Sequence, residues 1–321
     1  MNALDAKGWI SVFAPATIAN IGPGFDCFGL SLGEPGDIVR ARVVAEPGVR
    51  IVAIRCDDGA LPYEAPSNTA GKAAMAILAE QPEWSATNGL ELKLEKGLPV
   101  CSGLGSSAAS AVAGAMAAML AVSRASGCAY DRQRVLRAAI DGEAVASGAR
   151  HADNVAPALL GGFTIVQSLD PLRIVRLEPV LPCRVSTVTP ELAIATKAAR
   201  EILPKMVSLQ DAVANCANTA SVVAALMTAD GPLLRAALAD RFAEPYRAKL
   251  IPGFDEAKRA ALDAGAYGCS IGGSGPTLFA LAPDEDSARR AGQAIVGIFA
   301  RKGLASRLTV TTINPQGARQ L

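Results

Sequence analysis

The sequence predicts an α+β protein of two domains. Its 321 residues are more than one hydrophobic core usually serves, and 50% of them are hydrophobic. Short β-rich stretches and helical stretches are mixed along the chain, without the strict alternation of a doubly wound sheet. We place the domain boundary near Pro171, in the proline-punctuated stretch SLDPLRIVRLEP. The expected domains are therefore residues 1–170 and 171–321.

In the first domain, strands are expected where polar and apolar residues alternate or where β-branched residues gather. These strands are expected at 9–15, 49–56, 90–97 and 161–169. Pro15 is expected to end the first strand. Helices are expected at 67–80, 108–122 and 131–148. Ser67 and Asn68 are good cap residues for the first helix, and the second is too short and too alanine-rich to span a bilayer.

The second domain has the same mixture of elements. Strands are expected at 184–188, 192–195 and 307–313, with a strand–turn–strand unit at 267–282. Helices are expected at 210–229, 233–241, 255–264 and 284–300. Since helices and strands again do not alternate strictly, this half also favours an α+β class.

Charge and cysteine usage narrow the class of protein. The net charge is +1, so nothing global favours nucleic acid or a membrane surface as partner. Seven scattered cysteines and one histidine disfavour a zinc site and are typical of reduced thiols in the cytoplasm. Residues 1–10 lack an apolar stretch, so we expect no signal peptide.

Residues 99–120, PVCSGLGSSAASAVAGAMAAML, place glycines and serines directly before a helix. The first amides of a helix are unpaired and carry partial positive charge, so this stretch suits a phosphate group. An ordinary glycine turn with a serine cap is the alternative. No lysine follows the glycines, so this is not a P-loop, and a bound triphosphate would need a metal ion. Ser107 is the natural hydroxyl ligand for magnesium, and a carboxylate must come from elsewhere.

This stretch resembles the P-x-x-x-G-L-G-S-S-A-A signature of the GHMP kinases. Residues 14–32 (APATIANIGPGFDCFGLSL) resemble the first motif of that family, and residues 269–281 (CSIGGSGPTLFAL) resemble its third. Gly272 stands where relatives often have serine. The resemblance implies the two-domain GHMP kinase fold. In that fold an N-terminal α+β domain of ribosomal-protein type binds ATP together with a ferredoxin-like C-terminal domain.

Four stretches are most similar to the branch of the family that phosphorylates homoserine. They are ANIGPGFD (19–26), HADNVAPALLGG (151–162), TKAAREILP (196–204) and EPYRAKLIPGF (244–254). The resemblance implies ATP-dependent phosphorylation of the side-chain hydroxyl of L-homoserine to O-phospho-L-homoserine, a step of threonine biosynthesis. The implied cofactors are ATP and Mg²⁺.

The resemblance also implies residues for the nucleotide and its metal. Glu143 is the magnesium carboxylate beside Ser107, although a solvated helix face is its alternative. Asn68 contacts the nucleotide, although it can also simply cap a helix. The other implied nucleotide-binding residues lie in the two glycine-rich loops: Pro99, Ser102, Gly103, Leu104, Gly105, Ser106, Ser107, Gly273, Ser274 and Gly275.

For the substrate, the resemblance implies a carboxylate clamp of Arg200 and Arg247. Arginine suits this role because its planar fork matches a carboxylate. Asp26 is implied as the partner of the ammonium group and Asn20 as a nearby hydrogen-bonding group. The alternatives are solvated arginines and an Asx turn that shapes the loop. His151, the one histidine, is implied in substrate positioning, although a structural histidine is the commoner case.

The residue matching the catalytic aspartate of mevalonate kinase and galactokinase is Asn154. An amide cannot accept a proton at neutral pH, and the adjacent Asp153 must project in another direction. We therefore expect no dedicated protein base, with Asn154 orienting the hydroxyl and the proton passing to the γ-phosphoryl group. The expected catalytic residues are Asn154, Glu143 and Ser107.

Three other functions remain open from the sequence. The chain could be another small-molecule kinase of this family, acting on a mevalonate-pathway substrate or on shikimate. It could be a sensor that binds ATP and substrate without turnover, or a structural protein. A homodimer is an expectation taken from relatives of the family.

Overall fold

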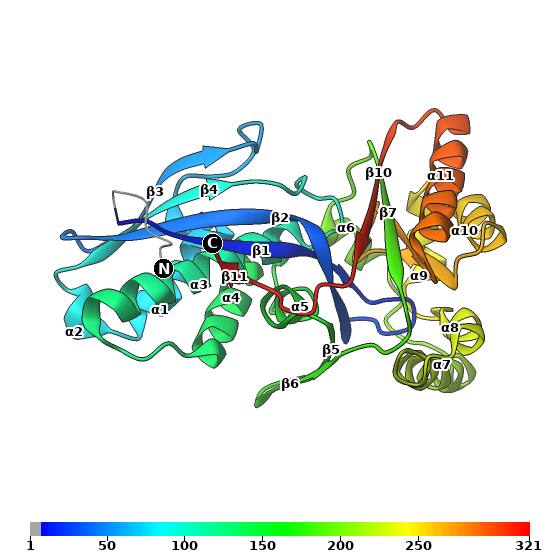
Figure 1. Cartoon of the computed structure of the whole chain (residues 1–321), viewed down its shortest axis with the longest axis horizontal. Helices are drawn as coiled ribbons and strands as arrows, with labels where there is room; N and C mark the ends of the chain where they lie inside the picture. Colours follow the sequence, from blue (N-terminus) through cyan, green and yellow to red (C-terminus); the bar gives the residue numbers. More distant parts are fainter. Residues whose placement is uncertain (1–7) are drawn as a thin grey trace.

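The computed structural model describes residues 8–321, and it contains two β-sheets with helices packed on them (Figure 1). Residues 1–7, on which the expected absence of a signal peptide largely depends, lie outside the described residues. The larger sheet occupies one half of the elongated molecule and the smaller sheet the other half. The confirmed fold class is therefore α+β.

The larger sheet has seven strands among the described residues. They are β1 (Ile10–Ala19), β2 (Phe28–Val44), β3 (Gly48–Arg55), β4 (Gly89–Glu95), β5 (Phe163–Leu169), β6 (Leu172–Leu177) and β11 (Arg319–Gln320). The order is β11-β1-β2-β4-β3, and β5 pairs with both β2 and β6. All pairs are antiparallel except β3 with β4.

The helices of this half pack on one another and on the sheet. They are α1 (Thr69–Ala79), α2 (Pro82–Ser85), α3 (Ser106–Ser126), α4 (Arg132–Ser147) and α5 (Val155–Leu160), preceded by the 3₁₀ turn η1 (Ala65–Ser67). Helix α3 contacts β1 and β2 on one side and α1 and α4 on another. A Cβ on Gly114 would lie 2.7–2.8 Å from atoms of Ala70, so small residues allow this close helix packing. Helix α3 is long and apolar enough to cross a membrane, but 78% of its most apolar window is buried inside the protein.

The smaller sheet is antiparallel throughout and has the order β10-β7-β9-β8. Its strands are β7 (Arg184–Pro190), β8 (Gly268–Ile271), β9 (Leu278–Ala282) and β10 (Ser306–Thr312). Numbered along the chain, this order is 4-1-3-2, with helices between the first and second strands and between the third and fourth. That arrangement is the βαββαβ pattern of ferredoxin-like domains. The expected C-terminal fold is therefore confirmed.

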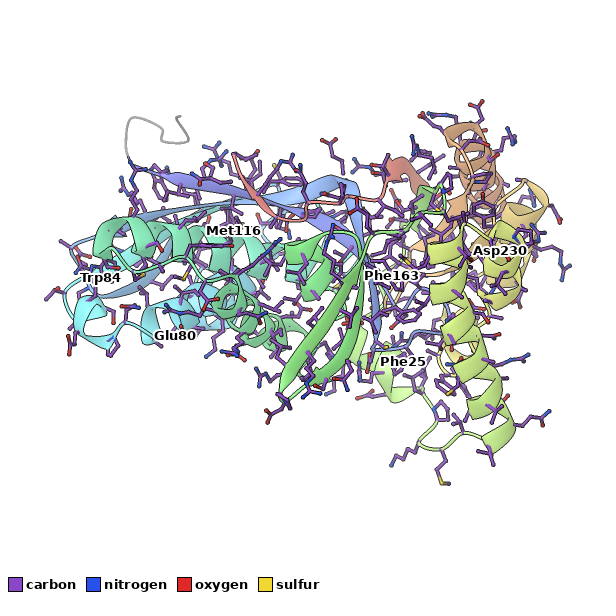
Figure 2. The ribbon with its side chains drawn as sticks, turned by 60° about the horizontal axis from the view of Figure 1, so that its bottom comes forward. Phe25, Glu80, Trp84, Met116, Phe163 and Asp230 are labelled. Atoms are coloured by element: carbon purple, nitrogen blue, oxygen red, sulfur yellow. The ribbon has the colours of Figure 1, made fainter. Side chains whose placement is uncertain are left out.

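The helices of the second half fall into two groups. Helices α10 (Phe254–Asp263) and α11 (Glu285–Arg301) pack against the smaller sheet. The others connect β7 to α10: α6 (Thr196–Glu201), α7 (Leu209–Thr228), α8 (Gly231–Ala237), α9 (Glu244–Arg247) and the 3₁₀ turn η2 (Ala248–Leu250). Val222 and Leu226 of α7 are buried in the core of the larger sheet, so this group joins the two halves. Phe25 and Phe163 lie near the middle of the molecule, whereas Trp84 and Asp230 lie toward its opposite ends (Figure 2).

The structure differs from three local expectations. Strand β1 continues past Pro15 to Ala19, because a register shift between Pro15 and Thr17 accommodates the residue that cannot donate a hydrogen bond. The expected strand at 192–195 is wrong: these residues have no regular secondary structure and lead into α6. The helix expected at 233–241 ends at Ala237, and Asp240 instead accepts hydrogen bonds from the amides that begin α9.

The β5–β6 hairpin occupies the region of the expected domain boundary. Its turn contains Asp170 and Pro171, and β6 continues the larger sheet to Leu177. The C-terminal strand β11 also returns to this sheet, where it pairs with β1. Two segments that follow residue 171, β6 and β11, therefore belong to the larger sheet.

Candidate active site

The candidate active site lies where three glycine-rich segments of the chain meet. They are the turn after β1 (residues 20–26), the loop before α3 (99–105) and the turn between β8 and β9 (272–277). The amide of Thr17 donates to the carbonyl of Leu104 at 3.0 Å, and the amide of Gly273 donates to the carbonyl of Ala19 at 3.2 Å. These backbone hydrogen bonds join the end of β1, directly before the first segment, to the other two segments.

The loop before α3 leaves helical amides available to a ligand. Gly105, the N-cap of α3, has φ of 65° and offers no side-chain cap, and the first intrahelical hydrogen bond comes from Ala109. Glycine tolerates this left-handed conformation, which an alanine would strain. Ser102 contributes a hydroxyl that is buried and has no hydrogen-bond partner among the described residues. This end of the site is therefore built from unpaired donors, as an anion site requires.

A buried cation lies directly behind this loop. Lys96 forms an ion pair with Asp37, and its Nζ also donates to the carbonyl and hydroxyl oxygens of Ser106 at 3.1 and 2.8 Å. Asp37 accepts hydrogen bonds from the backbone amides of Gly97 and Leu98 at 3.0 and 3.1 Å. The hydroxyl of Ser106 therefore contributes to the support of the loop. Sequence reasoning missed both residues, because Lys96 lay in a stretch expected only as an alternating strand and no element was expected around Asp37.

Ser107, in the first turn of α3, faces Glu143 of α4. The Ser107 hydroxyl donates to Oε1 of Glu143 at 2.8 Å, while Oε2 is buried without a partner among the described residues. Burial raises the pKa of Glu143 to about 8, against the lowering effect of the Ser107 hydrogen bond. Glu143 is 8% exposed, so it does not lie on a solvated face of α4.

The opposite end of the cleft is rich in charge. The guanidinium of Arg200 donates to both carboxylate oxygens of Asp26 at 3.0–3.2 Å. Arg247 is buried, and it donates to the carbonyls of Ala199 and Gly273 at 3.1 and 2.8 Å. Both guanidinium groups lie over the ring of Phe25, at 5.8 and 5.3 Å from its centre. Arg247 is thus not the solvated arginine of the alternative interpretation.

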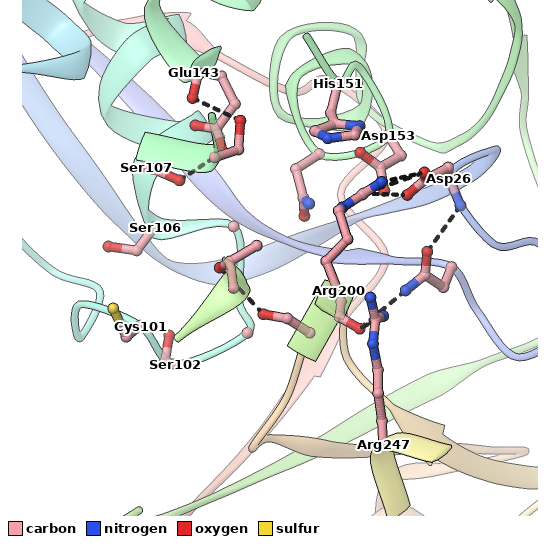
Figure 3. Close-up of a pocket in the computed structure, with 18 residues that line it drawn as sticks. Asp26, Cys101, Ser102, Ser106, Ser107, Glu143, His151, Asp153, Arg200 and Arg247 are labelled. Carbon is pink, nitrogen blue, oxygen red and sulfur yellow. Dashed lines mark hydrogen bonds and ion pairs between the residues drawn. The ribbon is translucent and has the colours of Figure 1, made fainter. Parts of the chain in front are cut away.

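Asp153 and His151 lie beside this charged group, away from Ser107 and Glu143 (Figure 3). Burial, reinforced by the charge of Asp26, raises the pKa of Asp153 to about 7. Burial lowers the pKa of His151, and its Nε2 is buried without a partner among the described residues. A neutral imidazole is therefore expected here at neutral pH.

Asn154, the N-cap of α5, lines the cleft together with residues of both ends. Its Oδ1 accepts a hydrogen bond from the hydroxyl of Thr17 at 2.7 Å. This contact joins β1, just before the first glycine-rich segment, to the segment that contains His151 and Asp153.

Comparison with known proteins places this geometry in a family. Residues 68–162 match the family described as GHMP kinases N terminal domain, and residues 222–301 match GHMP kinases C terminal. The chain belongs to the GHMP kinase family. It is 38% identical to homoserine kinase from Chlorobium phaeobacteroides, covering 97% of this chain and 98% of that one. It is 41% identical to homoserine kinase from Pyrococcus abyssi, covering 94% and 96% of the two chains.

Solved structures of GHMP kinases have the same fold. The crystal structure of homoserine kinase from Cytophaga hutchinsonii is 42% identical and has a TM-score of 0.91, with each chain covered completely. Mevalonate kinase from Methanococcus jannaschii has a TM-score of 0.69 at 12% identity, covering 96% and 99% of the two chains. At that identity the likeness concerns the fold alone.

In this GHMP kinase, two expected polar residues make internal hydrogen bonds. Asn20 donates to the carbonyl of Gly273 at 2.9 Å and accepts from the amide of Asp26 at 3.0 Å, so it ties two glycine-rich segments together. Asn68 caps α1 by accepting from the amides of Ala70 and Gly71 at 3.0 and 3.3 Å. Both residues still line the site.

Most of the expected residues line one of two adjoining clefts. The first cleft contains the charged residues Asp26, Arg200 and Arg247, together with Asn154 and the glycine-rich loops. The second cleft contains Asn68 with the apolar Val100 and Val145. Three expected residues, Pro99, Leu104 and Gly275, do not line either cleft. Leu104 is instead 4% exposed and packs in the core.

Three residues that sequence reasoning did not single out line both clefts: Cys101, Ser147 and Thr196. Thr196 begins α6, and its hydroxyl lies 3.4 Å from that of Ser274. Thr196 is the first residue of the stretch TKAAREILP that resembles the family, and this was the available signal for it.

Proposed function

We propose that this GHMP kinase transfers the γ-phosphoryl group of ATP to the side-chain hydroxyl of L-homoserine, giving O-phospho-L-homoserine for threonine biosynthesis. The observation that carries the proposal is the charged end of the cleft, which pairs Asp26 with Arg200 beside the buried Arg247. A zwitterion needs both an anionic and a cationic partner, and this end supplies both. The homoserine kinases named above support the same substrate.

The nucleotide is expected on the other side of the cleft. The free amides of the first turn of α3 suit the phosphates, and the adjoining cleft with Val100 and Val145 suits the apolar faces of a base. Asn68 lines that second cleft, which supports its nucleotide contact beside its capping role.

The residues present also fit a magnesium ion. Oε2 of Glu143 is buried and unpaired, and the Ser107 hydroxyl lies next to the same carboxyl group. A hydroxyl and one carboxylate, completed by phosphate oxygens and water, are the ligands that Mg²⁺ usually has in kinases. The described residues contain no group of three or more His, Cys, Asp or Glu side chains for a metal, so a nucleotide must complete the site. When bound, the ion would neutralise charge on the phosphates.

Substrate binding would replace the internal ion pair. In the proposed complex, Arg200 and Arg247 bind the homoserine carboxylate, and Asp26 binds the ammonium group. Asp153 and His151 lie beside Asp26, and Asn20 holds the loop that carries it. This arrangement directs the hydroxyl tail toward Asn154 and Ser107.

The proposed transfer needs no protein base. The hydroxyl oxygen of homoserine forms the new bond to the γ-phosphorus, the bond from that phosphorus to the bridging oxygen of ADP breaks, and the hydroxyl proton passes to an oxygen of the transferred group. Asn154 orients the hydroxyl and cannot take the proton. Phosphoryl transfer depends mainly on positioning and electrostatics, so this division of roles is sufficient.

A substrate panel tests the proposed function. Release of ADP and formation of the phosphorylated product are measured with magnesium-ATP and homoserine, mevalonate or shikimate. We expect kcat/KM for homoserine to exceed that for the other two by orders of magnitude. Faster turnover of mevalonate or shikimate would assign another GHMP substrate. Tight binding of ATP and homoserine without phosphohomoserine would assign a sensor.

The proposal includes a cytoplasmic enzyme that forms a homodimer. Support for the compartment comes from the cysteines, all seven of which are unpaired thiols. Light scattering of the purified protein measures its mass and tests the dimer.

A further inference from the structure

Thr17 makes one side-chain hydrogen bond among the described residues, and it does so to Asn154. The two residues are 137 positions apart, and the distance from Oγ1 of Thr17 to Oδ1 of Asn154 is 2.7 Å. Thr17 is completely buried in β1, directly after the register shift that follows Pro15. The irregularity of β1 thus lies directly before a residue whose hydroxyl reaches Asn154, which lines the cleft.

In the structure this contact turns the oxygen of the Asn154 amide toward Thr17. A carboxamide has one oxygen that accepts and one NH₂ group that donates. Since Thr17 donates to the oxygen in this structure, Nδ2, in the same plane, is the end of the amide that does not contact Thr17. Nδ2 makes no hydrogen bond to a described residue and is not among the buried unpaired atoms, and Asn154 lines the cleft. Asn154 therefore presents a hydrogen-bond donor to a ligand.

We propose that Thr17 is a positioning residue that fixes Asn154 as a donor toward the oxygen of the accepting alcohol. The identity of that alcohol rests on the proposed function. A donor bound to the alcohol oxygen leaves the hydroxyl proton directed elsewhere, toward an oxygen of the phosphoryl group. The opposite amide orientation would accept that proton in a hydrogen bond and hold it away from the phosphate.

The same pair contacts the loop that suits the phosphates. The amide of Thr17 donates to the carbonyl of Leu104 at 3.0 Å. A Cβ on Gly105 would lie 2.0 Å from Oγ1 of Thr17 and 2.9 Å from Oδ1 of Asn154. Thr17 therefore connects the amide that orients the alcohol with the backbone that holds the phosphates, and it sets the spacing between them.

Two matched variants test this role. Thr17→Val keeps the shape of the side chain and removes the hydroxyl, whereas Thr17→Ser keeps the hydroxyl. We expect kcat of Thr17→Val to fall about 10- to 100-fold, with KM for ATP changed less than about threefold, because one orienting hydrogen bond is lost. Thr17→Ser should stay within about threefold of the wild-type kcat. Wild-type kcat in Thr17→Val would overturn the proposal.

A double-mutant cycle separates positioning of Asn154 from a general structural role. If Thr17 acts through Asn154, Thr17→Val should cost less than about twofold in the Asn154→Ala background, because coupled residues are not additive. The same fold loss in both backgrounds would overturn the proposal. The cycle uses the alcohol that the wild-type enzyme phosphorylates in the panel or, if none is found, its slow hydrolysis of magnesium-ATP.

A spectroscopic measurement tests the contact without any substrate. In protein labelled with ¹⁵N in asparagine, the NH₂ signals of Asn154 are identified by their loss in Asn154→Ala. We expect these signals to move in Thr17→Val and to stay near their wild-type positions in Thr17→Ser. Unmoved signals in Thr17→Val would overturn the inference. Moved signals in a protein that does not phosphorylate homoserine would leave this inference standing and overturn only the proposed substrate.

Discussion

The two ends of the cleft offer different kinds of binding group. At the end proposed for the phosphates, called the phosphate end below, the site consists of helix amides, serine hydroxyls and the carboxyl of Glu143, whose pKa burial raises to about 8. The cation Lys96 is buried behind the loop in an ion pair. At the other end, Asp26 and Arg200 form an ion pair inside the cleft, beside the buried Arg247. The phosphate end therefore offers unpaired neutral groups to a ligand. At the charged end, the charges of Asp26 and Arg200 already pair with each other.

The difference follows from what each end must bind. Amides at a helix N-terminus are fixed in direction by the helix, so they can remain unpaired without a counter-ion. Charged side chains in a partly buried site are costly unless they are paired. A zwitterionic ligand can take the place of both partners of the Asp26–Arg200 pair, so binding exchanges one set of ion pairs for another. We therefore expect the phosphate end to depend on backbone geometry and the charged end on side-chain chemistry.

The largest expected effect comes from the backbone at Gly105. Gly105→Ala adds a Cβ at φ of 65° and within 2.0 Å of Oγ1 of Thr17, so the loop must move. We expect kcat/KM to fall about 10²–10³-fold, because the amides of α3 are displaced. The matched control is Gly127→Ala at the other end of α3, where φ is 76° and no atom lies within 4 Å. Equal activity losses in the two variants would contradict the special role of the phosphate end.

The next effect concerns the buried carboxyl group at the same end. Glu143→Gln keeps the size of the side chain but removes the carboxylate that suits magnesium. We expect kcat to fall about 100-fold at saturating ATP, since charge stabilisation on the phosphates is weakened. The thermal midpoint should not fall, because a buried neutral amide replaces a carboxyl group whose ionisation is unfavourable. Asp141→Asn on the exposed part of α4 is the control, and a similar loss there would contradict the assignment.

A substitution at the charged end should change KM for the amino-acid substrate. Arg200→Lys keeps the charge and removes the planar fork that donates to both carboxylate oxygens of Asp26. We expect KM for homoserine to rise about 10- to 100-fold while KM for ATP changes less than about threefold. Initial rates with each substrate varied in turn measure both constants. Arg289→Lys on the exposed face of α11 is the control, and an equal rise of both KM values in Arg200→Lys would remove the distinction between the ends.

Local sequence patterns predicted most of the elements, and motif similarity predicted most of the residues that line the first cleft but few of those that line the second. Alternation and capping signals are properties of neighbouring residues, so helices such as α1 and α4 could be placed within two residues at each end. The Thr17–Asn154 and Lys96–Asp37 contacts could not be predicted in this way, because their partners are 137 and 59 positions apart. The path of β1 through Pro15 depends on its pairing with β2, which no local pattern contains.

The smallest expected effect on turnover is that of a substitution at Asp153. It tests whether a residue of the charged end takes part in the phosphoryl transfer. Asp153 lies beside Asp26, Arg200 and His151, so we expect Asp153→Asn to lower kcat less than about tenfold. A loss of about 10⁴-fold with an unchanged structure would make Asp153 the general base and contradict a transfer without one. Glu201→Gln, in the exposed last position of α6, is the control.

The same variant should change how stability depends on pH. Burial and Asp26 raise the pKa of Asp153 to about 7, so between about pH 4 and 7 the folded protein holds a proton that the unfolded chain has released. The free energy of unfolding therefore falls through this range as the pH rises, by at most about 4 kcal/mol from this group. Asp153→Asn removes that fall, so its stability relative to wild type should increase from pH 5 to pH 8. Urea unfolding without ligands at the two pH values measures this difference, and a constant difference would mean that Asp153 is ionised in the folded protein.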